Sequence, residues 1–271
     1  MPRVTALYRY PVKGFTPEAC DSLTVLEKGR IAGDRVLGFR FADSATPDPA
    51  WSKKQELVVL INTPGLARLA VAFDHRALRL RISLDGTVLA DEGLDEVGRK
   101  RLCAALERYV EGLVENPLSG HPERLPLRLV GDGITPRYQD SVEGQATLHS
   151  RESLAAVAAA IDDSALDEVR FRSNIVIEGV KAWEEHEWFG RRIRIGEVEF
   201  DVVKHKTRCL ATHANPRTGE RDLRMMQLLM RHFDQKDPTF AVGMVANGDG
   251  RRIRIGDELS IGAQARTTPA Q

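Results

Sequence analysis

The 271-residue sequence predicts a mixed, β-rich α+β fold, and three observations lead to this prediction. Residues 4–90 repeat short segments of alternating apolar residues that are separated by turns. Helical spacing of apolar residues is confined to three segments. An arginine-flanked alternating segment occurs twice in the second half of the chain. A chain of this length can bury a sizeable core, in one large domain or in two smaller ones.

The first part of the chain is expected to form an antiparallel sheet. Pro11 and Gly33 interrupt the alternation. The pair Asp85-Gly86 is typical of a two-residue hairpin turn. The expected strands are residues 4–10, 23–26, 36–41, 57–61, 68–73, 78–82 and 87–90.

Three helices are expected after these strands. Residues 94–114 place Leu102 and other apolar side chains on one helical face. Ser150 can cap the N-terminus of a second helix, residues 151–161, whose run of alanines favours helix. Residues 222–233 form the third, and its methionines are expected in the core.

Residues 191–197 and 251–257 are near copies of one another. Each is an alternating strand that runs into a Gly-acidic turn, so each is expected to form a hairpin with the segment after it. Their arginines could mark a nucleic-acid surface, but the solvated outer face of a half-buried sheet explains the same pattern. Two copies do not predict a solenoid.

The composition is that of a soluble globular protein. With 39 Lys+Arg and 39 Asp+Glu, the formal net charge is zero, which argues against the broad basic field of a general nucleic-acid binder. No run approaches the length of about 18 apolar residues that spans a membrane, and the first residues lack the apolar core of a secretory signal. Three scattered cysteines do not make a disulfide scaffold. We expect a cytoplasmic protein with neither nucleic-acid nor membrane partners.

Cys209 is the first candidate for chemistry. It follows an expected strand, residues 198–203, and stands near Lys204, Lys206 and Arg208. Cationic neighbours favour a thiolate, which binds metals and attacks electrophiles. No helix start is evident after it, so activation by a helix N-terminus is not expected.

Other interpretations of Cys209 stay open at this point. A lone cysteine is often a small buried apolar residue. A cysteine hydrolase would use His205 or His213 as its base. A zinc site of His205, Cys209 and His213 has a spacing of four residues, but that spacing needs a helix, which the strand pattern and Pro216 argue against.

Cationic residues at expected strand ends form a second group of candidates. Lys13 can supply charge to a phosphate, and Gly14 leaves the backbone free to approach an anion closely. Arg35 and Arg172 occupy comparable positions. Together with Cys209 they make a set of phosphate- and metal-binding groups from distant parts of the chain.

Four short motifs now point to a family: Tyr10-Pro11-Val12-Lys13-Gly14, Gly33-Asp34-Arg35, Phe171-Arg172-Ser173-Asn174-Ile175, and Thr207-Arg208-Cys209 followed by Asn215-Pro216-Arg217-Thr218-Gly219. Their order resembles that of MOSC proteins, whose domain is shared with the C-terminus of molybdenum cofactor sulfurase. Over residues 3–261 the layout is similar to the mitochondrial amidoxime reducing component and bacterial N-hydroxylated-compound reductases. The resemblance implies a MOSC N-terminal β-barrel-like domain over residues 1–120. A MOSC β-barrel domain with flanking helices would follow over residues 121–271.

The resemblance also assigns site residues. Cys209 matches the cysteine that ligates molybdenum, at the catalytic centre. Arg172 and Asn174 match residues that hold the pterin and its phosphate. The positions assigned to the molybdenum cofactor (Mo-molybdopterin) are Lys13, Gly14, Arg35, Ser150, Arg172, Asn174, Thr207 and Arg208.

Three residues depart from the family pattern. Gly14 stands where the family often has Ser, and Ser173 replaces a usual Pro. Gly243 stands where the mitochondrial members have a Tyr beside the cofactor, which is expected to widen or reshape the substrate side.

The implied function is a molybdenum-dependent oxidoreductase that reduces N-oxygenated (N-hydroxylated) small molecules by two-electron removal of oxygen. Electrons would come from a separate donor protein, such as a ferredoxin, a flavodoxin-type protein or a cytochrome with its reductase. His213 is a candidate for proton delivery. The alternative is a non-redox carrier of the cofactor or of sulfur that uses Cys209. A third reading, a pyridoxal-phosphate enzyme with Lys13 as Schiff base, lacks the large-domain architecture such enzymes use.

Overall fold

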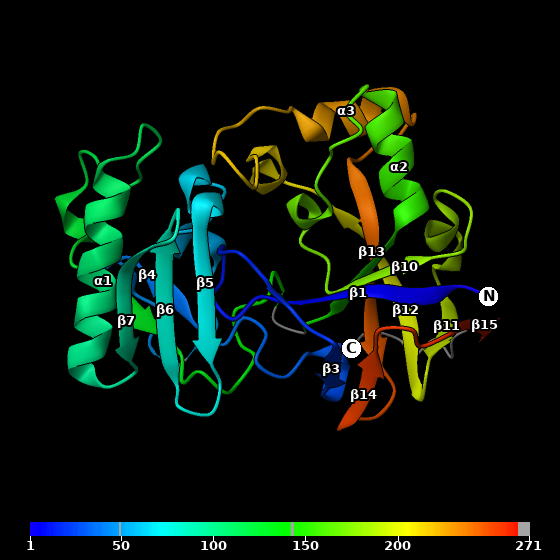
Figure 1. Cartoon of the computed structure of the whole chain (residues 1–271), viewed down its shortest axis with the longest axis horizontal. Helices are drawn as coiled ribbons and strands as arrows, with labels where there is room; N and C mark the ends of the chain where they lie inside the picture. The colour runs from blue at the N-terminus through cyan, green and yellow to red at the C-terminus, as the bar shows by residue number, and fades with distance from the viewer. Residues whose placement is uncertain (49, 142–143, 265–271) are drawn as a thin grey trace.

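A long, curled sheet forms the right-hand part of the molecule in Figure 1. In the computed structural model, which describes residues 1–48, 50–141 and 144–264, it has eight strands in the order β15-β11-β12-β13-β9-β10-β1-β2. β9 and β10 are parallel, and the other neighbouring strands are antiparallel. The strands are β1 (Arg3–Arg9), β2 (Glu18–Ala19), β9 (Ala146–Ser150), β10 (Ile175–Glu178), β11 (Arg191–Ile195), β12 (Val198–Thr207), β13 (Thr239–Ala246) and β15 (Leu259–Gln264).

The start of β1, which lies next to the edge strand β2, meets the opposite edge strand, β15. The backbone N of Val4 in β1 donates to the carbonyl of Asp257 at 2.9 Å, and the N of Leu259 in β15 donates to the carbonyl of Pro2 at 2.8 Å. The sheet therefore curls into a barrel, and alternate side chains from its strands fill the interior. A two-stranded ladder of β3 (Ser22–Val25) and β14 (Arg251–Arg254) adds to the same core.

A smaller antiparallel sheet lies on the left of Figure 1. It consists of β5 (Leu69–Asp74), β6 (Arg79–Leu84) and β7 (Thr87–Gly93). Helix α1 (Glu96–Glu111) packs against it, with Leu102, Leu106 and Val110 in a shared core. The short pair β4 (Gly38–Arg40) and β8 (Arg128–Val130) lies beside that core.

Two further helices, α2 (Arg151–Ala160) and α3 (Met225–His232), cover the outside of the large sheet near β13. Val157, Met225 and Leu229 pack there against Phe171 and Phe240. Short 3-10 helices occupy several connections: Glu27–Gly29, Lys54–Glu56, Pro64–Arg68, Pro122–Arg124, Glu168–Phe171, Glu184–Trp188 and Leu210–His213.

The β-rich α+β fold class and the flanking helices are confirmed. Ser150 caps α2 by accepting a hydrogen bond from the backbone N of Ser153. The Asp85-Gly86 turn joins β6 to β7 with both residues at positive φ, 49° and 82°, as a type I′ turn requires.

Three expected elements are wrong in part. Residues 57–61 are not a continuous strand: Leu57 forms an isolated bridge with Arg40 of β4, and the Asn62 side chain bonds the backbone N of Val59 and the carbonyl of Leu57, both at 3.0 Å. β14 does not form a hairpin with the segment after it but pairs with β3. Helix α3 begins at Met225 rather than at residue 222.

The start of the chain belongs to the same sheet as its second half. β1 pairs with β10, and β3 pairs with β14. Strands from residues 1–120 and from the segment after residue 120 therefore share one barrel.

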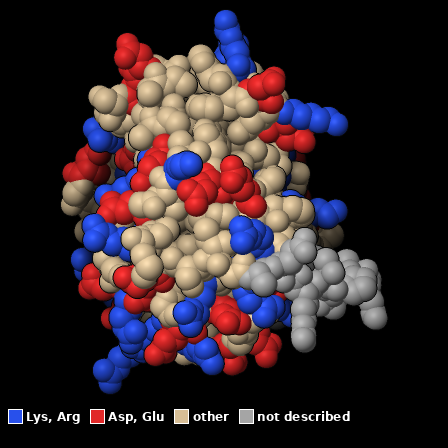
Figure 2. All heavy atoms as spheres, turned by 90° about the vertical axis from the view of Figure 1, so that its right-hand side faces the viewer, with Lys and Arg blue, Asp and Glu red and all other residues tan. Residues whose placement is uncertain are grey.

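The arginine-rich strands lie on an outer face of mixed charge. Figure 2 shows Lys and Arg interspersed with Asp and Glu over this side of the molecule. Arg192 in β11, for example, forms ion pairs with Asp201 at 2.8 Å and with Glu199 at 3.7 Å. The described residues include no helix that is both long enough and apolar enough to cross a membrane.

His149 gives the fold a sensitivity to acid. Its ring is buried beside Phe171 and Phe240, and neither ring nitrogen has a hydrogen-bond partner among the described residues. Burial lowers the pKa of His149 to about 3. Below pH 6.5 the unfolded chain therefore binds a proton at His149 that the folded chain does not bind. The free energy of unfolding falls as the pH drops from 6.5 toward 3.

We expect His149→Leu to reduce this sensitivity. Between pH 7.5 and pH 5 the wild type should lose about 2 kcal/mol more unfolding free energy than the variant. Urea unfolding at the two pH values measures the difference, in which any pH-independent change of packing cancels. An equal loss in both proteins would show that His149 is not the responsible group.

Candidate functional site

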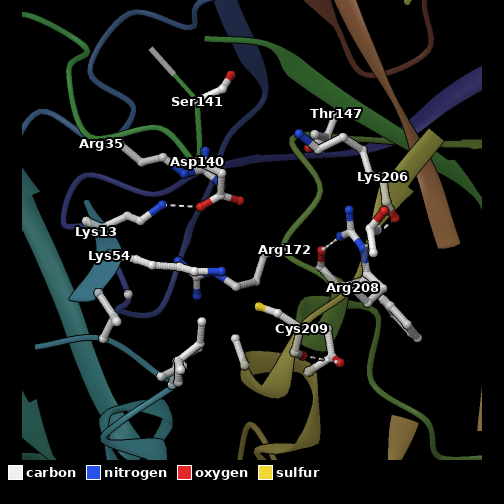
Figure 3. A pocket seen from close by; sticks show the side chains of 18 of the residues that line it. Lys13, Arg35, Lys54, Asp140, Ser141, Thr147, Arg172, Lys206, Arg208 and Cys209 are labelled. Atoms are coloured by element: carbon white, nitrogen blue, oxygen red, sulfur yellow. Dashed lines mark hydrogen bonds and ion pairs between the residues drawn. The ribbon is translucent and has the colours of Figure 1, made fainter. Parts of the chain in front are cut away.

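A cavity of about 230 Å³ opens between β12 and the loops around Lys13, Arg35 and Asp140 (Figure 3). Among the described residues that line it, seven are Lys or Arg and only Asp140 is acidic. The cations come from five separate segments of the chain: Lys13, Arg35, Lys54, Arg172, and Lys204, Lys206 and Arg208 of one segment. The fold thus concentrates positive charge that the neutral composition does not reveal.

Asp34 organises the N-terminal wall of this cavity. Its buried carboxylate accepts hydrogen bonds from the backbone N of Tyr10 at 2.8 Å and from Nδ2 of Asn174 at 3.2 Å, and it forms an ion pair with Arg35. Arg35 has a positive φ of 53° and lies with its guanidinium 4.9 Å from the centre of the Tyr10 ring. Lys13, also buried, forms an ion pair with Asp140.

Arg172 reaches the cavity because its backbone is left-handed, with φ 57°, at the end of the 3-10 helix Glu168–Phe171. Its Nη1 donates to the carbonyl of Phe15 at 2.7 Å, and its guanidinium stacks 4.4 Å from the centre of the Tyr10 ring. Its Nη2 is buried and has no hydrogen-bond partner among the described residues. A donor in this state is available to a ligand in the cavity.

Arg208 and Cys209 lie where β12 ends. Arg208 donates from Nε to the carbonyl of Lys206 at 3.0 Å and from Nη1 to the carbonyl of Phe171 at 2.9 Å. Cys209 begins the 3-10 helix Leu210–His213, contrary to the expectation that no helix follows it. Its thiol makes no capping bond, and Figure 3 shows the sulfur directed into the cavity on the Arg172 side.

The cavity also has an apolar part. Val59, Leu60, Ile61 and Ala211 line it. Arg221 ties two of these segments together, because its guanidinium donates to the carbonyl of Ile61 at 2.6 Å and to that of Leu210, next to Cys209, at 2.8 Å.

Gly14 lines the cavity, and its backbone requires glycine for a different reason from the one expected. With φ at 87°, a Cβ would lie 2.8 Å from the Cα of Val59. The close approach is therefore to the protein's own backbone.

Gly14→Ser should lower the unfolding free energy by about 2 kcal/mol, because the new side chain would strain the backbone and collide with Val59. Denaturant unfolding checks this, and a variant as stable as the wild type would contradict it.

Gly243 in β13 leaves room for two side chains that line the cavity, so of the two expected effects the structure favours a reshaped rather than a widened cavity. A Cβ here would lie 2.6 Å from Oε1 of Gln145 and 3.0 Å from Cδ of Lys206. Gln145 and Lys206 fill the space, and Nζ of Lys206 donates to Oε1 of Gln145 at 3.3 Å.

The structure brings most of the residues expected from sequence to the cavity. Lys13, Gly14, Arg35, Arg172, Thr207, Arg208 and Cys209 all line it. Two others do not. Asn174 is buried, and its side chain bonds Thr147, Tyr8 and Asp34. Ser150 is buried at the start of α2, where it bonds Ser153 and Glu185.

The histidines proposed as bases or metal ligands also lie outside the cavity lining. His205 stacks on His186 with 4.9 Å between ring centres. His213 is buried and accepts a hydrogen bond from the backbone N of Met226 at 3.4 Å. The described residues contain no cluster of three or more His, Cys, Asp or Glu side chains arranged for a metal ion. Among the described residues that line the cavity, Cys209 carries the only thiol, the group that suits a soft metal.

The cavity fits an anionic ligand. Burial lowers the pKa of Lys13 and of Arg172, that of Lys206 to about 8, and that of Arg208 to about 10. The negative charge near these cations does not offset the cost of burying them. A bound phosphate would add negative charge and stabilise their charged forms. With a thiol at its edge and an unpartnered guanidinium nitrogen in its wall, the cavity suits a group that carries both a phosphate and a thiophilic metal.

Lys54, Asp140 and Gln145 are lining residues that sequence reasoning missed. They lie in segments without hydrophobic periodicity or a recognisable motif, so no sequence signal placed them near Cys209.

Comparison with known proteins finds similarity over parts of the chain. Residues 135–260 match the model of the MOSC domain. Molybdenum cofactor sulfurase from Caenorhabditis briggsae is 32% identical over 130 residues, which are 48% of this chain and 18% of that protein. The sulfurase from Caenorhabditis elegans is 36% identical over 73 residues, 27% of this chain and 10% of that protein. That from Anopheles gambiae is 32% identical over 93 residues, 34% of this chain and 12% of that protein.

The matched segments thus span less than a fifth of each of these relatives. Among solved structures, the YuaD protein from Bacillus subtilis aligns over 98% of both chains with 10% sequence identity and a TM-score of 0.41.

Proposed function

We propose, from the match of residues 135–260 to the MOSC domain model, that this protein binds the molybdenum cofactor in the cavity and reduces N-oxygenated small molecules such as amidoximes. One observation carries the proposal: the sulfur of Cys209 and cations from five chain segments face the same cavity. A soft thiolate suits molybdenum, and clustered guanidinium and ammonium groups suit a phosphate. When bound, the metal and its dithiolene supply the two-electron chemistry.

The chain's own residues would bind and orient. Arg172, with its free Nη2, and Lys13 would hold the phosphate, and Cys209 would ligate the metal. Arg208 is fixed by two backbone carbonyls, so its charge stays in place when the cavity is filled. The apolar wall of Leu60 and Ile61 would exclude water from one side of the substrate.

The overall reaction converts an N-hydroxy compound, two electrons and two protons into the reduced nitrogen compound and water. The electrons would come from a separate protein of the ferredoxin, flavodoxin or cytochrome type. Cys20, Cys103 and Cys209 are all free thiols. Free thiols are typical of a reducing compartment, and we place the protein in the cytoplasm.

An activity assay tests the proposal. Protein from a host that makes the cofactor is mixed with benzamidoxime and a chemically reduced viologen dye, and benzamidine is quantified. Protein from a cofactor-deficient host is the control. We expect product only with the first preparation. Molybdenum-loaded protein that reduces neither benzamidoxime nor an N-hydroxylated base would contradict the reductase proposal.

A carrier of the cofactor or of its sulfur is the second candidate. The similarity to molybdenum cofactor sulfurases favours it, as does the partly exposed thiol of Cys209. Cys209 would receive a sulfane sulfur from a donor persulfide, so the donor thiolate leaves and a persulfide forms on Cys209. Incubation with a persulfide-loaded cysteine desulfurase, followed by peptide mass spectrometry, detects one added sulfur atom. Absence of that sulfur on Cys209 would argue against the carrier.

A further inference from the structure

Asp140 stands out because it is the one acidic residue among the described residues that line a strongly cationic cavity. Its carboxylate forms an ion pair with Lys13, and Figure 3 shows it lying among the side chains of Lys13, Arg35 and Lys206. Its side chain is 67% exposed, so the carboxylate is not buried in the protein's own packing. The carboxylate of Asp140 thus lies in the region to which the cations would attract an anionic ligand.

The charge of Asp140 acts on most of the cations around the cavity. It opposes the effect of burial on the pKa of Lys13, Arg172, Lys206 and Arg208. In return, the ammonium group of Lys13 holds the pKa of Asp140 well below its usual range. The carboxylate is ionised at neutral pH and partly neutralises the cavity.

We propose that Asp140 is an internal counter-ion that competes with the phosphate of the ligand for Lys13 and its neighbouring cations. A ligand phosphate must either displace the carboxylate or bear its repulsion. Both the attraction to these cations and the repulsion by Asp140 are about twice as large for a dianionic phosphate as for a monoanion. Asp140 therefore lowers the affinity of the cavity for anions. The identity of the natural ligand rests on the proposed function; the competition does not.

The test uses the full chain purified without cofactor, titrated with inorganic phosphate by calorimetry in a chloride–Hepes buffer. Asp140→Asn removes the charge and Asp140→Glu retains it. Glu96→Gln, on the exposed face of α1, makes the same change in net charge far from the cavity. Acetate serves as the monoanionic probe, and circular dichroism confirms that each variant is folded.

We expect Asp140→Asn to bind phosphate about fivefold more tightly than the wild type, the scale of one partly exposed ion pair. Asp140→Glu and Glu96→Gln should stay within about twofold of the wild type. Acetate should gain no more than phosphate from Asp140→Asn, because the repulsion removed is smaller for a monoanion. Equal or weaker phosphate binding by Asp140→Asn would overturn the inference, as would an equal gain in Glu96→Gln.

A separate arm examines the proposed function. Cofactor-loaded protein should no longer bind free phosphate, because the cofactor's phosphate occupies the cations. If loaded protein binds phosphate as the empty protein does, the placement of the cofactor is wrong. The effect of Asp140 on the empty protein would still stand.

Discussion

Cys209→Ser is expected to lower the reduction of benzamidoxime at least about a hundredfold, the scale on which a metal site loses function when its ligation is disturbed. A serine hydroxyl is a harder and far less acidic donor than a thiol, and it does not replace a thiolate on a soft metal. The fold should be unaffected, because the Cys209 side chain caps no helix and belongs to none of the hydrophobic core clusters. Turnover and melting temperature, measured on the same preparations, separate the two effects.

Cys20→Ser is the matched control for this experiment. Cys20 is also free and partly buried, but it does not line the cavity. Its variant should reduce benzamidoxime at the wild-type rate. Full turnover by Cys209→Ser, or an equal loss in both variants, would remove Cys209 from the reaction.

Asp34→Ala is expected to destabilise the folded protein by about 3–5 kcal/mol, the cost of removing one partner of a buried ion pair. The variant leaves the buried guanidinium of Arg35 without its carboxylate. It also removes the acceptor for the backbone N of Tyr10 and for Nδ2 of Asn174. A loss of this size lowers the melting temperature by about 10 °C in a chain of this length. Urea unfolding gives the free energy directly.

An exposed ion pair provides the comparison. Lys100 and Glu96 form an i,i+4 pair on α1, with side chains 74% and 83% exposed. Lys100→Ala should leave the melting temperature nearly unchanged, because water screens such pairs. If Asp34→Ala were as mild as Lys100→Ala, Asp34 would not be organising the wall of the cavity.

The regular elements could largely be predicted, because their physical signals are local. Alternation of apolar residues located β1, β5, β6 and β7, and a two-residue turn joined the last two. Ser150 was predicted as a helix cap from its side chain alone, and it caps α2. That role also explains why Ser150 stays away from the cavity.

The errors come from contacts that are distant in sequence. Residues 57–61 have the composition of a strand, but only Leu57 and Val58 pair with β4, and the Asn62 side chain bonds the backbone of Leu57 and Val59. β14 looks like the first strand of a hairpin, but the backbone of residues 256 and 257 bonds Val4 and closes the barrel. Neither set of contacts can be predicted from the local pattern of apolar residues.

The site residues also fall into those that could be predicted from the sequence and those that could not. Lys13, Arg35 and Cys209 were predicted from their charge or thiol chemistry at expected strand ends and from the motifs in which they occur. Asn174 belongs to such a motif as well, but here it joins Thr147, Tyr8 and Asp34 inside the wall. Asp140 has no motif or periodicity, and only the folded chain brings it to Lys13.

The central claim is that this cavity holds a molybdenum cofactor, and the metal content of the protein tests it most directly. The protein is purified from a host that synthesises the cofactor and from one that does not, and molybdenum per chain is measured by elemental analysis. We predict close to one molybdenum per chain from the first host and none from the second. Absence of molybdenum from the first preparation, in a protein that is folded and binds inorganic phosphate, would contradict the claim.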